Sequence, residues 1–212
     1  KELAIIHYTS GTTSAPKGVM LTYRNLSASI DFGHRHIEVR PDDSLVSMLP
    51  MAHIYGMTYE FLYPVSGGCT VYFLGKTPTP TLLMKALAEV KPYLLITVPL
   101  VIEKIFKGKV KKQFTSSAFM RSLYGVGFIR RYLHRLAGKK LTKTFGGRIR
   151  FFGIGGSKLD GEVEQFLLDA KFIYDIGYGL TETAPLLAGA VDGMLRHGST
   201  GPILKGIEYR LE

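Results

Sequence analysis

The sequence is poor in cysteine and has no long apolar run. Cys69 is the only cysteine among 212 residues, so no internal disulfide can form, and we expect a reducing, cytoplasmic location. No apolar run reaches the roughly 18–20 residues that a membrane-spanning helix needs. The sequence therefore argues against a disulfide-stapled domain, and no segment of it is predicted to cross a membrane.

Acidic residues are missing from one long segment. Residues 104–150 contain 14 Lys and Arg residues and no Asp or Glu, which leaves 13 basic and 17 acidic residues in the rest of the chain. The formal net charge of +10 is therefore a property of this one segment. A local basic surface suits an anionic partner such as phospholipid head groups, an acidic cofactor or nucleic acid.

Outside that segment, short apolar runs alternate with amphipathic stretches. This alternation predicts βαβ units, and so an α/β fold with a mainly parallel sheet flanked by helices. Thr22 and Asp160 are in positions to cap two of the helices. The predicted strands are residues 3–8, 44–49, 71–74, 93–97, 148–153 and 172–176, with further helices at 57–65, 81–90 and 100–106.

Residues 108–147 interrupt this alternation as a basic helical insertion. Apolar residues such as Phe128, Tyr132 and Leu136 are interspersed there with arginines and lysines, as in amphipathic helices. Two interpretations are open: a solvated helical hairpin on the domain surface, or a patch that contacts a membrane peripherally. Nucleic acid is not an expected partner, because no recognition motif is present and the aromatic residues do not form a stacking platform.

The stretch after the first predicted strand is the most specific in the chain. Residues 8–19 have the sequence YTSGTTSAPKGV, a series of hydroxyl, glycine and lysine positions. A strand that opens into such a loop presents backbone N–H groups, hydroxyls and one ammonium to a single point, as polyphosphate sites do. The better-known phosphate loop has glycine before the lysine and Ser or Thr after it, whereas Lys17 lies between Pro16 and Gly18.

The full string resembles the phosphate loop of the adenylate-forming superfamily, which includes acyl-CoA synthetases, luciferases and adenylation domains. The family usually has glycine, which takes positive φ readily, where this chain has Ser14. By the resemblance, the loop binds the phosphates of ATP through Thr9, Ser10, Gly11, Thr12, Thr13, Ser14 and Lys17.

Three further segments resemble blocks of the same family, in the family's order. In residues 49–56 the family histidine lines the acyl pocket, which assigns that role to His53, with a structural histidine as the alternative. Residues 153–159 resemble the segment that lines the adenine pocket. Residues 198–206 resemble a structural signature near the end of the large domain. The adenine-binding residues implied by the second block are Gly155, Gly156 and Ser157.

The run YGLTET at residues 178–183 carries the remaining chemistry of the resemblance. It implies that Tyr178 stacks on adenine and that Thr181 touches the α-phosphate. Glu182 would hold Mg²⁺, which usually takes only one or two protein carboxylates. Gly179 would form part of a tunnel wall, because a missing side chain leaves room for an acyl chain.

The resemblance implies a reaction in two steps. A carboxylate attacks the α-phosphate of Mg-ATP to form an acyl-adenylate and pyrophosphate, and coenzyme A then displaces AMP. The implied catalytic residues are Lys17, His53, Thr181 and Glu182, with ATP, Mg²⁺ and coenzyme A as cofactors or co-substrates. Residues 178–183 and the basic segment look most like long-chain fatty acyl-CoA synthetases. The alternative substrates are aryl or medium-chain acids.

Comparison with the family predicts that residues 1–212 are the central part of its large domain. The family's ribose-binding block, its C-terminal small domain with the catalytic lysine, and its amino-terminal part have no counterpart in this sequence. We therefore expect this chain by itself to be catalytically inactive. Two non-enzymatic alternatives are also open, a lipid- or membrane-binding module and a structural or regulatory fragment.

Overall fold

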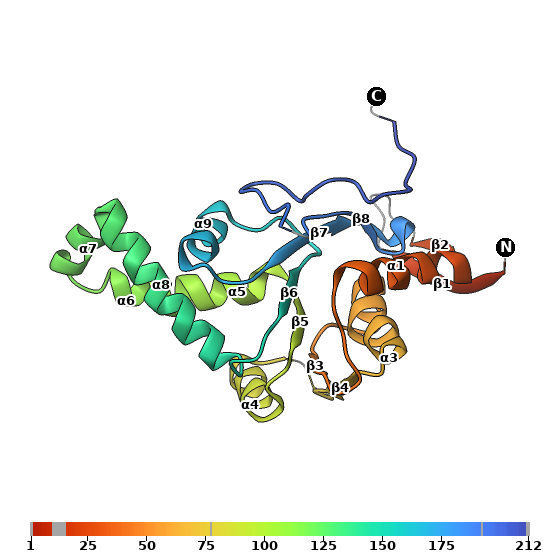
Figure 1. Cartoon of the computed structure of the whole chain (residues 1–212), viewed down its shortest axis with the longest axis horizontal. Coiled ribbons are helices and arrows are strands. Elements are labelled where there is room, and N and C mark those ends of the chain that lie inside the picture. The colour runs from red at the N-terminus through yellow and green to blue at the C-terminus, as the bar shows by residue number, and fades with distance from the viewer. Residues whose placement is uncertain (1, 10–15, 77, 192, 211–212) are drawn as a thin grey trace.

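A six-stranded sheet forms the centre of the computed structural model (Figure 1). The structure describes residues 2–9, 16–76, 78–191 and 193–210. The strands lie in the order β4 (Thr70–Phe73), β3 (Ser44–Ser47), β5 (Leu94–Thr97), β6 (Phe151–Ile154), β7 (Asp175–Gly179) and β8 (Leu186–Gly189). Neighbours from β4 to β7 are parallel and β8 is antiparallel to β7, so the predicted mainly parallel sheet is confirmed.

Helices cover both faces of the sheet, and each face has its own buried core. On one face lie α1 (Tyr23–His36), α2 (Ile54–Gly56), η1 (Met57–Leu62) and α3 (Tyr63–Ser66); on the other lie α4 (Pro80–Val90), α5 (Pro99–Ile105), α8 (Gly127–Thr144) and α9 (Gly161–Ala170) (Figure 1). The larger core contains Phe106, Phe152 and Phe166 on the α9 side, whereas Leu45 and Tyr63 lie in the core on the α1 side. Burial of such side chains drives the assembly of the layers.

Local side-chain hydrogen bonds fix where two of the helices begin. The Thr22 hydroxyl accepts a hydrogen bond from the N–H of Asn25 (3.3 Å), and Asn25 Oδ1 accepts one from the N–H of Thr22 (2.9 Å). This pair forms a capping box at the start of α1. The Asp160 carboxylate accepts hydrogen bonds from the N–H groups of Glu162 (2.9 Å) and Val163 (3.2 Å) at the start of α9. Both predicted caps are therefore confirmed.

The prediction of a buried first strand is wrong. β1 (Leu3–Thr9) pairs antiparallel with β2 (Lys17–Thr22) in a two-stranded sheet of its own, and only its His7 is buried. The short connection explains why β1 and β2 are antiparallel. Parallel pairing needs a crossover of about a dozen residues or more, and only residues 10–16 separate the two strands. The sequence pattern also does not predict β2 or the edge strand β8, and β7 begins later than predicted, at Asp175.

The basic segment is helical, as predicted. η2 (Phe106–Lys111), α6 (Lys112–Phe114) and α7 (Ala118–Gly125) lead into α8, and α7 lies at the end of the molecule away from α1 (Figure 1). An ion pair between Lys107 and Asp160 (2.6 Å) ties η2 to the start of α9. Gly138 lets α8 approach α9 closely, since a Cβ there would lie 2.7 Å from the Cβ of Ala170. One side of α8 is therefore anchored against α9.

Candidate active site

The carboxyl ends of the parallel strands open onto a cavity of about 420 Å³. Ligands bind at this edge in open α/β sheets, because the loops after successive strands converge there. Five residues singled out by the sequence line this one cavity: His53, Gly155, Gly156, Gly179 and Thr181. The structure thus brings together three motifs that are far apart in the chain.

His53 reaches the cavity from a turn between β3 and α2. Its N–H donates to the carbonyl of Pro50 (2.9 Å), and its own carbonyl accepts a hydrogen bond from the N–H of Met57 (3.0 Å). The residue is exposed, and Leu49 and Pro50 line the cavity beside it. An imidazole at a cavity wall can donate a hydrogen bond to a carboxylate, which fits the acyl-side role that the resemblance implies.

The loop after β6 offers backbone rather than side chains to a ligand. Gly155 is buried and donates its N–H to the carbonyl of Thr97 (3.1 Å). Gly155 and Gly156 both line the cavity, so a planar base could approach the main chain closely at this point. Ser157 and Tyr178 are exposed and are not among the described residues that line the cavity. Their adenine-binding roles stay predictions.

The predicted phosphate loop connects β1 to β2. Thr9 and Lys17 are register partners across this hairpin, and Lys17 is exposed. An exposed ammonium on the last paired position of the hairpin is free to contact a phosphate. The remaining predicted phosphate ligands lie outside the described residues: Ser10, Gly11, Thr12, Thr13 and Ser14.

A small apolar cluster holds the hairpin next to the other motifs. Leu21 of β2, Ile54 of α2 and Ala184 after η3 (Thr181–Thr183) pack together in it, along with Leu26 of α1. The hairpin, the His53 turn and the Thr181 turn therefore share one support. Because this support depends on burial of side chains from distant segments, no local sequence signal marks it.

The turn after β7 presents two predicted site residues to two cavities. Thr181 lines the main cavity, whereas the exposed Glu182 lines a second cavity of about 790 Å³ between α1 and residues 202–207. Leu186 lines both cavities. The described residues hold no group of three or more His, Cys, Asp or Glu that could bind a metal. A single exposed carboxylate still fits Mg²⁺, because phosphate oxygens and waters supply its other ligands.

Gly179 lines the main cavity, but a ligand is not the reason why a side chain is missing there. A Cβ at Gly179 would lie 1.6 Å from the carbonyl oxygen of Pro185. The chain itself thus fills the space, and only glycine permits this close approach. The missing side chain therefore does not leave room for an acyl chain, and the role of Gly179 in a tunnel wall stays a prediction.

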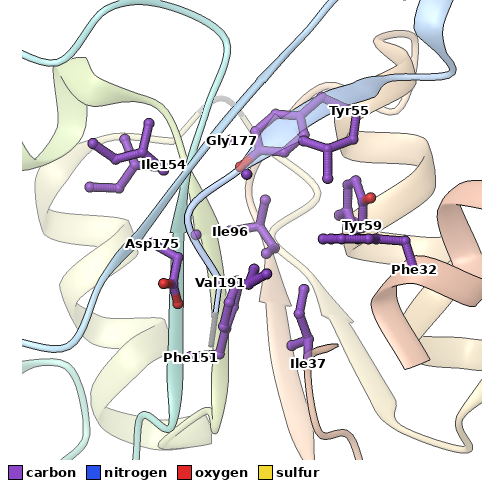
Figure 2. Close-up of a pocket in the computed structure, with 14 residues that line it drawn as sticks. Phe32, Ile37, Tyr55, Tyr59, Ile96, Phe151, Ile154, Asp175, Gly177 and Val191 are labelled. Atoms are coloured by element: carbon purple, nitrogen blue, oxygen red, sulfur yellow. The ribbon is translucent and has the colours of Figure 1, made fainter. Parts of the chain in front are cut away.

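Tyr55 is shared by the main cavity and a smaller apolar one, which Figure 2 shows. It lines both cavities, and its hydroxyl donates to the carbonyl of Thr97 (3.4 Å). Burial raises the pKa of the Tyr55 phenol far above its usual range, so the side chain is neutral at physiological pH. The smaller cavity has a volume of about 40 Å³ and lies among apolar side chains that include Phe32, Ile37 and Phe151. The sequence does not single out Tyr55.

Glu60 is a second residue that the sequence does not single out. Its side chain is completely buried and accepts hydrogen bonds from the Ser47 hydroxyl (3.0 Å) and the N–H groups of Met48 (3.1 Å) and Leu49 (2.8 Å). Burial raises the pKa of Glu60 to about 7, and these hydrogen bonds oppose that shift. It is the one charged residue within residues 54–65, and this isolation is the signal that could have marked it.

The sequence profile of the AMP-binding enzyme family matches residues 1–212, which is the whole chain. The chain belongs to this family. The family assignment agrees with the geometry described above, in which the glycine loop after β6 and the turn after β7 line one cavity and the β1–β2 hairpin packs next to them.

Relatives of this chain include proteins of a plant and of yeast. It is 29% identical over 227 residues to "Long chain acyl-CoA synthetase 7, peroxisomal" of Arabidopsis thaliana, covering 100% of this chain and 32% of the relative. It is 34% identical over 192 residues to "Long-chain-fatty-acid--CoA ligase 4" of Saccharomyces cerevisiae, covering 84% of this chain and 28% of the relative. The chain thus spans about a third of the length of the curated relatives that it matches.

Solved structures, a benzoate CoA ligase among them, share the fold of this chain. A benzoate CoA ligase from Burkholderia xenovorans LB400 superposes with a TM-score of 0.69 at 20% identity, covering 97% of this chain and 35% of that one. MatB from Rhodopseudomonas palustris superposes with a TM-score of 0.71 at 24% identity, covering 96% of this chain and 34% of that one. At such identities the likeness establishes the fold alone.

Proposed function

We propose that the protein, at its natural length, uses ATP to convert a long-chain fatty acid through an acyl-adenylate into its coenzyme A thioester. The observation that carries this proposal is the single cavity at the carboxyl ends of the strands, which His53, Gly155 and Thr181 line from three separate segments. Relatives named long-chain acyl-CoA synthetases or ligases support the substrate class. Residues 1–212 would then form the central part of the large domain of a cytoplasmic enzyme.

This reaction needs the phosphate charge to be neutralised and the reacting groups to be positioned, and it needs no nucleophile from the protein. In the first step a carboxylate oxygen attacks the α-phosphorus of ATP, the bond from that phosphorus to the bridging oxygen breaks, and pyrophosphate leaves. In the second step the thiol sulfur of coenzyme A attacks the acyl carbon, its proton passes to water, and AMP leaves. Both steps are accelerated by fixed donors that hold the reacting groups in line.

Each group of site residues has a place in this scheme. Lys17 and the loop hydroxyls would hold the β- and γ-phosphates through charge-assisted hydrogen bonds, and Thr181 would contact the α-phosphate. His53 would hold the attacking carboxylate, and the main chain at 155–156 would contact adenine, with Tyr178 stacked on the base. Mg²⁺ held by Glu182 would neutralise phosphate charge.

The apolar space beyond Tyr55 supports an acid with a hydrocarbon chain. The smaller cavity shares this residue with the main one, and most of the side chains that line it are apolar, with Asp175 as the charged residue among them. An alkyl chain gains about 0.8 kcal/mol for each methylene that it buries in such a place. An aryl or medium-chain acid is the alternative substrate for the same adenylation chemistry.

The test is pyrophosphate release by the protein at its natural length, with Mg-ATP and acids of graded chain length, with and without coenzyme A. We expect release to be greatest for long-chain acids and a thioester to form only when coenzyme A is present. If pyrophosphate release is greatest for an aryl or medium-chain acid, the adenylation reaction is supported but the long-chain substrate is contradicted. No release across the panel would contradict the enzymatic proposal as a whole.

We further propose that the exposed side of α8 binds an anionic phospholipid surface. Phe128 and Tyr132 are exposed one turn apart, and the basic residues Arg131, Arg135 and Lys139 follow the same side of the helix at intervals of four. An apolar line flanked by basic residues is how helices lie at a bilayer surface. No helix in the described part of the chain is both long and apolar enough to span a bilayer.

Vesicle co-sedimentation tests this second proposal. We expect binding to phosphatidylcholine vesicles that contain phosphatidylserine, weaker binding to phosphatidylcholine alone, and loss of binding at high salt. Replacing Arg131 and Arg135 by serine should weaken binding by on the order of 10-fold or more, since each basic residue contributes about 1 kcal/mol. Replacing Lys76 and Lys85 by serine removes the same charge elsewhere and should have less effect. Equal effects of the two pairs would contradict a specific α8 surface.

A further inference from the structure

Glu60 closes a clamp around the turn that carries His53. The turn begins where β3 ends, and it leads into the continuous helical segment α2–η1 on which Glu60 lies. The Glu60 carboxylate reaches back to the start of the turn and accepts hydrogen bonds from the N–H groups of Met48 (3.1 Å) and Leu49 (2.8 Å). Both ends of the turn are therefore held by one side chain.

The turn between these two ends faces the main cavity. Leu49, Pro50 and His53 line the cavity, and a hydrogen bond from the N–H of His53 to the carbonyl of Pro50 (2.9 Å) keeps the turn tight. A shift of Leu49 would therefore move Pro50 and His53 relative to the glycine loop, which lines the same cavity. Misplacement of a reacting group by about 1 Å can cost about 100-fold in rate.

We propose that Glu60 is a positioning residue, whose ionised carboxylate holds the 49–53 turn in the geometry that places His53 against the acid substrate. The inference rests on the proposed function, because it assigns the acid to the His53 side of the cavity. Glu60 does not itself line the cavity and acts through the turn.

The surroundings of the carboxylate make its ionisation sensitive to each hydrogen bond. It is completely buried, and among the described residues no Lys, Arg or His contributes to its pKa. The groups that face it are the Ser47 hydroxyl and two N–H groups from the end of β3, and on its own helical segment the phenol of Tyr55, whose pKa the Glu60 charge raises further. Loss of the charge leaves these donors with fewer acceptor sites, which weakens the clamp.

Two variants separate positioning from general structural damage. Glu60→Gln keeps the shape of the side chain but replaces an acceptor oxygen by an N–H₂ group that faces other donors. We expect kcat/KM for the acid to fall by about 10- to 100-fold, while the KM for ATP changes much less. In the protein at its natural length, the pH profile of kcat/KM for the acid substrate should lose its step near pH 7. Ser47→Ala removes one hydrogen bond to the ionised form, so it should keep that step and move it to higher pH.

Amide NMR of this chain gives a readout that does not depend on activity. We expect the amide resonances of Met48 and Leu49 to titrate with a midpoint near pH 7, and those of Met51 and Ala52 within the turn to follow the same curve. The titration should disappear in Glu60→Gln and move upward in Ser47→Ala. If Glu60→Gln does not fold, Ser47→Ala decides the question alone.

Three results would overturn the proposal. One is a turn whose amides do not follow the titration of Met48 and Leu49, because Glu60 would then not control its geometry. Another is an unchanged kcat/KM for the acid in Glu60→Gln, and the third is a Ser47→Ala profile that does not move. Absence of pyrophosphate release by the unmodified protein would instead contradict the proposed function, and the NMR titration would still decide whether Glu60 controls the turn.

Discussion

His134 of α8 and Asp169 of α9 are joined by a largely buried hydrogen bond of 2.9 Å between Nδ1 and a carboxylate oxygen. The other ring nitrogen lies 2.8 Å from the hydroxyl of Tyr124 on α7. Because a carboxylate only accepts hydrogen bonds, we assign the proton to Nδ1, and Nε2 then accepts from Tyr124. Burial lowers the pKa of His134 although Asp169 opposes the shift, so the ring is neutral at neutral pH. These two hydrogen bonds hold α8 against α9 and α7.

The hydrogen bond between His134 and Asp169 predicts a stability effect for Asp169→Ala. The substitution leaves the Nδ1–H of His134 buried without its acceptor, and we expect the free energy of unfolding to fall by about 1–3 kcal/mol in a urea titration. Asp31→Ala is the control, because within the described part of the chain the one ion pair of Asp31 is an exposed 3.9 Å contact with Arg35. It should change stability by less than about 0.5 kcal/mol. Similar losses in both variants would mean that the buried bond does not stabilise the helix pair.

The buried carboxylate of Glu60 predicts an unusual pH dependence of stability. Its pKa is raised from 4.5 to about 7, so between these values the folded chain retains a proton that the unfolded chain has lost. The contribution of Glu60 to the free energy of unfolding therefore falls as the pH rises through this window, by about 3 kcal/mol in total.

Urea titrations of the unmodified chain and of Glu60→Gln at pH 5 and pH 8 measure this contribution. His134 acts with the opposite sign, since its lowered pKa makes stability rise with pH up to about its ordinary value of 6.5. That effect is common to both chains and cancels in the difference between them. Stability differences that are the same at the two pH values would show that the ionisation of Glu60 is not shifted by folding.

Lys17→Met should impair ATP use without affecting the fold. Lys17 is exposed, so its loss leaves no buried group without a partner, and the thermal midpoint should stay the same. A charge-assisted hydrogen bond to phosphate contributes about 1.5–3 kcal/mol, so kcat/KM for ATP should fall about 10- to 100-fold in the pyrophosphate assay. Lys85→Met, on α4, removes an equal charge away from the cavity and should be silent. Equal losses of kcat/KM in Lys17→Met and Lys85→Met would show that the effect comes from net charge and not from a contact between Lys17 and phosphate.

Tyr55→Ala should change acid selectivity. Tyr55 lines both the main cavity and the apolar cavity that Figure 2 shows beside Phe32 and Phe151, so we expect removal of its ring to make the two spaces continuous. We expect the ratio of kcat/KM for long-chain over medium-chain acids to rise several-fold, because extra methylenes become buried. Tyr55→Phe removes only the hydroxyl and its hydrogen bond to Thr97, and should leave the ratio nearly unchanged. A falling ratio in Tyr55→Ala would place the acyl chain elsewhere.

The sequence by itself determined the features that depend on neighbouring residues. Alternation of apolar runs with amphipathic stretches is enough to predict an α/β fold, because periodicity records which side of each element is buried. Thr22 and Asp160 cap their helices through residues at most three positions away. The family is recognisable from residues 8–19 and 178–183 for the same reason, since each motif is contiguous.

Only the tertiary structure decided which distant segments share a surface. It placed β1 in a separate hairpin, filled the space beside Gly179 with the carbonyl of Pro185, and put Thr181 and Glu182 on two different cavities. The bonds of Glu60 to the end of β3 depend in the same way on packing between segments that no local pattern relates. Which of these segments become buried together and form hydrogen bonds depends on the packing of the whole chain. A linear pattern of residues does not record that packing.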